Sequence, residues 1–157
     1  MVIGISCVVM AVLLAVAEVR ARHAREVSEM RLRDALIVGI AQIGALIPGV
    51  SRSGSTLTAA LFLNFKREEA ARFSFLLGLP AIALAGLKEL WVLLHADMPA
   101  HAWPHLLFGL VVASISAFFA IWGLMKFLER FSTWPFVIYR ALLGVFLIVA
   151  VSTGLLS

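Results

Sequence analysis

One stretch constrains the fold of this chain more than any other: Pro-Gly-Val-Ser-Arg-Ser-Gly-Ser-Thr at positions 48–56. Apolar runs at 35–47 and 57–65 flank it, and each is too short to cross a bilayer, since a spanning helix needs about 20 apolar residues. Irregular backbone at membrane depth needs protein or water to satisfy its polar groups, and an arginine there indicates a functional site. The alternative is an ordinary cytoplasmic turn in which Arg52 pairs with lipid phosphate.

The composition places that stretch in a membrane protein. The 157 residues are 62% hydrophobic and only 14% charged, which predicts one integral membrane bundle rather than a soluble domain. A net charge of +4 is also found in nucleic-acid-binding proteins. The basic residues here cluster at the ends of apolar segments, where they set membrane orientation, so we exclude nucleic acid as a partner. Cys7 is the only cysteine, which excludes an intrachain disulfide and argues against a cysteine-based metal site.

Four segments are long and apolar enough to span a membrane, at about 1–17, 73–93, 104–125 and 135–156. No basic region precedes the first segment, so we expect a spanning helix with its N-terminus outside rather than a signal peptide. Glu18 to Asp34 carries acidic and basic residues four apart, which predicts a solvated helical connector. Pro80 predicts a kink in the second span, and Gly109, Ala113 and Ala117 suit close helix packing on the third.

Loop charges decide how the broken segment lies. If 35–65 is a re-entrant hairpin of two half-helices, Ala35–Ile47 and Ser53–Phe65, the basic loops at 18–34, 66–72 and 126–133 all lie in the cytoplasm. A single crossing would move the last two loops outside with their charges. Lys88, toward the outer end of a span, is the exception. The sequence therefore predicts an all-α, polytopic membrane bundle with one re-entrant helical hairpin.

The hairpin tip has the chemistry of an anion site. Its hydroxyl and guanidinium groups lie before or within the first turn of the second half-helix: Ser51, Arg52, Ser53, Ser55 and Thr56. Free backbone N–H groups and the positive end of the helix dipole favour an anion there, and an arginine fork suits phosphate oxygens. Ser53 is the expected helix cap, and Gly49 and Gly54 let the backbone approach a ligand. A buried diphosphate or sulfate-like group fits this tip, which does not match a Walker loop.

Residues 42–56, Gln-Ile-Gly-Ala-Leu-Ile-Pro-Gly-Val-Ser-Arg-Ser-Gly-Ser-Thr, closely resemble the second signature of the bacterial undecaprenyl-diphosphate phosphatase, or bacitracin-resistance, family. Residues 70–77 with Pro80, and Tyr139-Arg140 with Leu143-Gly144, resemble the same family. The resemblance covers essentially the whole chain and corresponds to the C-terminal half of the family fold, one repeat of an inverted-repeat architecture.

The resemblance implies an enzyme of the bacterial inner membrane that hydrolyses undecaprenyl diphosphate to the monophosphate, recycling the lipid carrier of cell-wall synthesis and giving bacitracin resistance. It implies Mg²⁺ or Ca²⁺ as the cofactor. Carried over by motif position, Arg52 would grip the diphosphate, with Ser51 and Ser53 beside it as catalytic residues. Gly54 and Thr56 would bind the substrate with them, and Gln42 would lie behind these groups.

The chain also departs from the family pattern. The first repeat, with its glutamate-rich motif and histidine, is not matched, and Ala41 and Ala45 stand where that repeat has acidic residues. No carboxylate lies within either half-helix, so we identify no metal ligands in this chain. The histidines of the outer loop and its flank are weak site candidates, and the remaining acidic residues are expected to be solvated or interfacial: His95, His101, His105; Glu68, Glu69, Glu89.

Two other classes of function stay open. A polyprenyl-phosphate transporter or flippase could use the same broken helix to hold an anion at the midplane. A noncatalytic half-protein or fragment would need a partner half or a second copy of itself.

Overall fold

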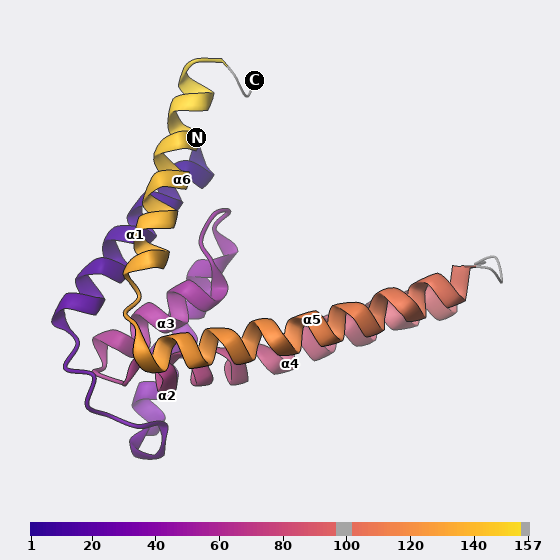
Figure 1. Ribbon diagram of the computed structural model, residues 1–157, viewed down its shortest axis with the longest axis horizontal. Coiled ribbons are helices and arrows are strands. Elements are labelled where there is room, and N and C mark those ends of the chain that lie inside the picture. Colours follow the sequence, from indigo (N-terminus) through magenta and orange to yellow (C-terminus); the bar gives the residue numbers. More distant parts are fainter. Residues whose placement is uncertain (97–101, 155–157) are drawn as a thin grey trace.

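The computed structural model describes residues 1–96 and 102–154 as two helical arms that meet in a V (Figure 1). One arm pairs α1 (Val2–Arg20) with α6 (Trp134–Ser152), and the other pairs α4 (Arg67–Leu94) with α5 (Ala102–Arg130). A shorter hairpin of α2 (Leu32–Ile43) and α3 (Arg52–Phe62) lies near the junction of the arms. The 3-10 turns η1 (Val27–Glu29) and η2 (Gly44–Leu46) complete the order. The all-α fold predicted from the sequence is confirmed.

Four of these helices, α1, α4, α5 and α6, have the length and apolar composition to cross a membrane, as the sequence predicted. This is a multi-pass membrane protein. The helices extend beyond the predicted spans into charged residues, because helical hydrogen bonding continues past the apolar segment: α1 runs on to Arg20 and α5 to Arg130. The second span is one continuous helix through Pro80.

Two glycines let α1 and α6 pack closely. A Cβ atom added at Gly4 would lie 2.8 Å from Ile148 Cγ1, and one at Gly144 would lie 2.7 Å from Val8 Cγ2. Small residues of this kind allow two membrane helices to approach with their backbones. The helices run antiparallel, since the start of α1 meets the end of α6.

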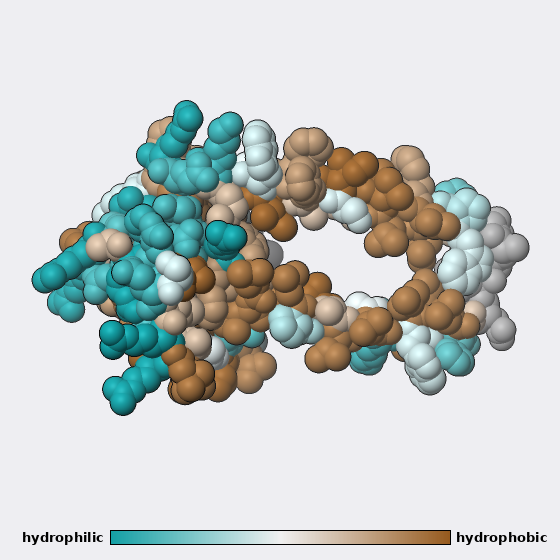
Figure 2. Space-filling model, turned by 90° about the horizontal axis from the view of Figure 1, so that it is seen from below, coloured by the Kyte–Doolittle hydropathy of each residue, from teal (hydrophilic) through white to brown (hydrophobic). Residues whose placement is uncertain are grey.

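The other arm is open. Figure 2 shows an opening between α4 and α5, whose apolar surfaces contrast with the hydrophilic junction end. Gly86, Gly109 and Gly123 have no atom within 4 Å of an added Cβ. We expected the small residues that begin at Gly109 to pack closely against another helix. At Gly109 itself, no helix of the described chain comes into contact. These apolar side chains need lipid or a further protein segment around them.

The charged connector differs from the sequence prediction. α1 ends at Arg20, and residues 21–31 are not an α-helix. Glu18 is buried, where it pairs with Arg67 at 2.6 Å and accepts a hydrogen bond from Thr133 Oγ1 at 2.9 Å. Long-range partners thus replace the expected contact between Glu18 and the basic residue four positions later, Arg22. Glu18 ties the end of α1 to the starts of α4 and α6.

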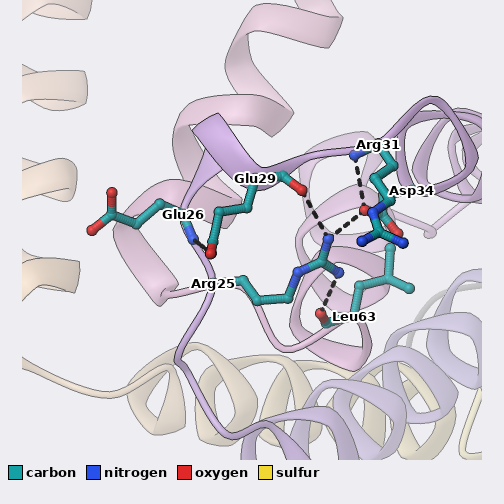
Figure 3. A network of polar contacts seen from close by, with 6 residues as sticks. All are labelled: Arg25, Glu26, Glu29, Arg31, Asp34 and Leu63. Atoms are coloured by element: carbon teal, nitrogen blue, oxygen red, sulfur yellow. Dashed lines mark hydrogen bonds and ion pairs between the residues drawn. The ribbon is translucent and has the colours of Figure 1, made fainter.

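Arg25 fixes both ends of the α2–α3 hairpin (Figure 3). Its guanidinium donates to Leu63 O at the end of α3 and to Glu29 O, both at 3.1 Å, and forms an ion pair with Asp34 in the first turn of α2. It also lies 4.5 Å from the centroid of the buried Phe65 ring. Because one side chain holds both ends, the hairpin begins and ends at the same end of α1, as a re-entrant segment would require.

Candidate functional site

The hairpin tip packs against the opposite end of α1. Gly49 has φ +91°, a left-handed conformation that favours glycine, and an added Cβ would lie 2.8 Å from the Cα and O atoms of Ile3. Cys7 Sγ donates to Gly49 O at 3.7 Å. The tip therefore reaches the first two turns of α1, far from the charged connector at which the hairpin begins.

Ser51, rather than Ser53, caps α3. Ser51 has extended backbone angles, and its Oγ accepts a hydrogen bond from Gly54 N at 3.1 Å. The helix consequently begins at Arg52, one residue before the predicted start. Ser53 lies in the first turn, with its Oγ 3.2 Å from Ser51 Oγ. Both hydroxyls stay beside the free N–H groups of the helix start.

A cavity of about 390 Å³ opens at this tip. Its polar groups come from three elements: the tip itself, α4 and α6. Its walls are otherwise apolar, with leucines from α1, α5 and α6 and aromatic rings from α4 and α6. The lining includes Ser51, Ser53, Gly54, Ser74, Tyr139 and Arg140 on the polar side, and Leu14, Leu128, Phe136 and Leu143 on the apolar side. A polar end with apolar walls suits an amphipathic anion.

Arg140 of α6 is the site residue that sequence reasoning missed. Its guanidinium donates to Gly49 O at 2.9 Å, and a Cβ added at Gly54 would lie 2.5 Å from its Nη1. Gly54 thus makes room for the Arg140 side chain against the start of α3. The available signal was an arginine inside the last apolar span, the same signal that singled out Arg52.

Arg52 lies outside the cavity lining, against α4. A Cβ added at Gly78 would lie 3.1 Å from Arg52 Nη2, so the guanidinium sits on the α4 surface at this glycine. Within residues 1–96 and 102–154, neither Arg52 nor Arg140 forms an ion pair. Two guanidinium charges without a carboxylate partner therefore flank the positive end of α3, an arrangement that favours an anion.

The other predicted site residues lie outside the cavity lining. Thr56 is buried, and its hydroxyl bonds to the carbonyls of Arg52 at 3.0 Å and Ser53 at 3.2 Å, which fixes the first turn of α3. Gln42, near the end of α2, has a buried Oε1 that accepts no hydrogen bond from the described residues. The structure therefore brings Ser51, Ser53 and Gly54 together with Arg140, while Thr56 supports the turn from behind.

The described residues do not fit a divalent cation. Neither a carboxylate nor an imidazole lines the cavity, and within the described ranges no three His, Cys, Asp or Glu side chains gather in one place. Mg²⁺ and Ca²⁺ bind chiefly carboxylate and carbonyl oxygens. His95 and His105 do not line the cavity, and His101 lies outside the described residues.

These features define a polytopic helical membrane protein in which two arginines and two serine hydroxyls gather at the tip of a helical hairpin. Residues 1–146 match the family described as bacitracin resistance protein BacA, and the chain belongs to that family.

Several proteins named undecaprenyl-diphosphatase are similar in sequence to this chain over nearly its whole length. Undecaprenyl-diphosphatase 2 of Mesorhizobium japonicum is 72% identical over 156 residues, 99% of this chain and 59% of that protein. Undecaprenyl-diphosphatases of Synechocystis sp. and Synechococcus elongatus are 51% and 49% identical, over 97% and 99% of this chain and 47% and 54% of their own lengths. The chain thus spans about half the length of the curated relatives it matches.

Proposed function

We propose that this chain forms the diphosphate-binding half of an undecaprenyl-diphosphate phosphatase of the bacterial inner membrane, which recycles the lipid carrier of cell-wall synthesis and confers bacitracin resistance. One observation carries the proposal: two arginines without carboxylate partners in the described chain flank the start of α3, beside a cavity with apolar walls. The activity named for the similar proteins agrees with this arrangement.

The polar and the apolar residues of the site would bind different parts of the substrate. The Arg140 guanidinium, the Ser51 and Ser53 hydroxyls and the free N–H groups of α3 would bind the diphosphate oxygens. Leu14, Phe136 and Leu143 would contact the first isoprene units of the chain. Donors held in place in a low-dielectric site stabilise the negative charge that grows on phosphoryl oxygens during hydrolysis.

Activation of the attacking water is not explained by the described residues. A general base or metal is needed for this step, and the cavity lining offers no carboxylate or histidine. We propose that a partner half or a second copy of the chain supplies these groups, together with the ligands of the expected Mg²⁺ or Ca²⁺. None of the described residues is assigned a role in binding the cation.

Phosphate release from undecaprenyl diphosphate in detergent tests the proposal. The assay compares the purified chain with the same chain plus the part of the Mesorhizobium relative that lies outside the aligned residues. Release by the combination supports a phosphatase half. Movement of a polyprenyl phosphate across vesicle membranes without phosphate release would instead indicate a transporter. If neither phosphate release nor lipid movement is detected, the proposal is contradicted.

A further inference from the structure

Ser74 on α4 is a buried hydroxyl without a partner. The residue is 7% exposed, and its Oγ forms no hydrogen bond within the described chain. Helical serines commonly bond the carbonyl four residues earlier, as Ser114 does with Leu110 O at 2.7 Å. A buried hydroxyl that makes no such bond lowers stability, so its presence calls for an explanation.

Ser74 lies where the proposed ligand would sit. It lines the same cavity as Ser51, Ser53 and Arg140. Gly78, against which the Arg52 guanidinium rests, is four residues further on and so lies on the same face of α4. Between Ala71, one turn before Ser74, and Gly78, that face is made of small, buried residues. Ser74 and the start of α3 thus border one cavity, and the Arg52 guanidinium rests one turn further along the same face.

We propose that Ser74 is a substrate-binding residue whose hydroxyl donates a hydrogen bond to a phosphate oxygen of the bound lipid diphosphate. This inference rests on the proposed function. The bound ligand supplies an acceptor for the Ser74 hydroxyl. The hydroxyl is therefore hydrogen-bonded in the complex, and the unfavourable free energy of leaving it unpaired is removed there. α4 thereby becomes the third element, with the hairpin tip and α6, that contacts the anion.

Binding of farnesyl diphosphate, a short soluble lipid diphosphate, to the purified chain in detergent tests this role. We expect Ser74→Ala to raise the dissociation constant about 10-fold, the effect of losing a hydrogen bond to a charged group. Without ligand, the same variant should unfold at the same temperature as the unsubstituted chain or higher, because the removed hydroxyl has no partner. Ser114→Ala is the matched control: it removes a helical serine hydroxyl outside the cavity and should leave the dissociation constant unchanged.

The outcomes separate the inference from the proposed function. If the unsubstituted chain binds farnesyl diphosphate and Ser74→Ala binds it equally well, the Ser74 role is wrong and the anion site remains. A lower unfolding temperature for ligand-free Ser74→Ala would show that the hydroxyl has a structural bond, which also overturns the role. Failure of the unsubstituted chain to bind would overturn both.

Inorganic pyrophosphate separates the headgroup from the prenyl chain. If Ser74 contacts phosphate, Ser74→Ala should weaken pyrophosphate binding by the same factor as farnesyl diphosphate binding. A loss confined to the prenylated ligand would place Ser74 at the lipid chain and contradict the hydrogen bond.

Discussion

At the scale of single residues, the site depends on how two arginines are held. Arg140 is fixed by Gly49 O and by the space at Gly54, whereas Arg52 rests on α4 without a hydrogen bond to its guanidinium in the described chain. Arg140 is therefore positioned before the ligand arrives. Arg52 is available to turn toward a second group of oxygens, such as those of the second phosphate.

Replacing Arg52 with lysine tests whether the shape of the guanidinium matters as well as its charge. Arg52→Lys keeps the charge but loses the bidentate fork, so we expect phosphate release to fall about 100-fold or more. Activity is measured on the chain combined with the complementary part of its relative. Arg72→Lys, at an exposed position of α4, is the control and should change little. An Arg52→Ala variant as active as the unsubstituted protein would show that the anion is held elsewhere.

Gly54→Ala should disturb the site without unfolding the protein. The new Cβ would meet Arg140 Nη1, the end of a flexible side chain that can move, and would push the guanidinium away from Gly49 O. We expect farnesyl diphosphate to bind about 10-fold more weakly. Gly39→Ala in α2 is the matched control, since no atom lies within 4 Å of its added Cβ. It should preserve binding and slightly raise the unfolding temperature, because alanine favours helix. Equal binding by both variants would contradict the role of Gly54.

At the scale of elements, the hairpin depends on its base. Asp34 accepts hydrogen bonds from the Arg25 guanidinium and from Arg31 N, and its pKa is lowered, first of all by the bond from Arg25. A lowered pKa means that the folded protein binds the proton less readily than the unfolded chain. The resulting stability is present above the ordinary aspartate pKa, near 4, and is lost as pH falls through the lower folded value.

Asp34→Asn should therefore destabilise the protein in a pH-dependent way. At pH 7 we expect the unfolding temperature to fall by about 2–4 °C. The difference in unfolding temperature between the two proteins should narrow as pH falls below about 4, because Asp34 then takes up a proton and loses its charge. Glu26→Gln is the control, because it breaks an exposed ion pair with Lys66 and should have little effect at any pH. If the difference in unfolding temperature stayed the same at low pH, Asp34 would stabilise the protein through its shape rather than its charge.

Cysteine labelling tests whether the hairpin re-enters. With Cys7 changed to serine, Ser28→Cys before the hairpin and Arg72→Cys after it should react with an impermeant thiol reagent from the same side of the membrane. His95→Cys, at the far end of α4, should react from the other side. Reaction of the Ser28 and Arg72 variants from opposite sides would show that the segment crosses the membrane instead.

The sequence predicted the positions of the elements better than the contacts between them. The hairpin follows from Pro48 and Gly49 between two short apolar runs, and the spans follow from length and hydropathy. The contacts of Glu18 with Arg67, and of Arg25 with Leu63, join residues far apart in the chain, which local spacing cannot reveal. Arg140 was missed for a related reason: although this arginine stands out in an apolar span, the sequence does not show which face of that span turns toward the hairpin tip.

At the scale of the whole molecule, the two arms differ in how far they are packed. α1 and α6 approach closely at Gly4 and Gly144, whereas α4 and α5 leave an opening between them (Figure 2). Large apolar side chains beyond Gly78 on α4, such as Leu84 and Trp91, are exposed. The arm that carries Ser74 is therefore also the one with the most surface left for lipid or for a further protein segment.

We predict that this chain alone releases phosphate poorly. Hydrolysis needs neutralised charge and an activated water, and the described residues account only for the first. Because the chain covers 59% of its Mesorhizobium relative, the rest of that relative is the partner half with which we test this. We expect the isolated chain to bind farnesyl diphosphate but to hydrolyse undecaprenyl diphosphate at least 100-fold more slowly than the recombined halves.

The comparison is made at equal chain concentration, with Mg²⁺ present, and the oligomeric state is measured by light scattering with correction for detergent. Rates that rise with the square of the chain concentration would indicate that a second copy replaces the partner half. The positive-inside charges argue against two identical copies inserted in opposite directions, so we expect the partner half to be required. Full activity from a proven monomer would contradict the prediction and would require Glu68, Glu89 or an outer histidine to reach the hairpin tip.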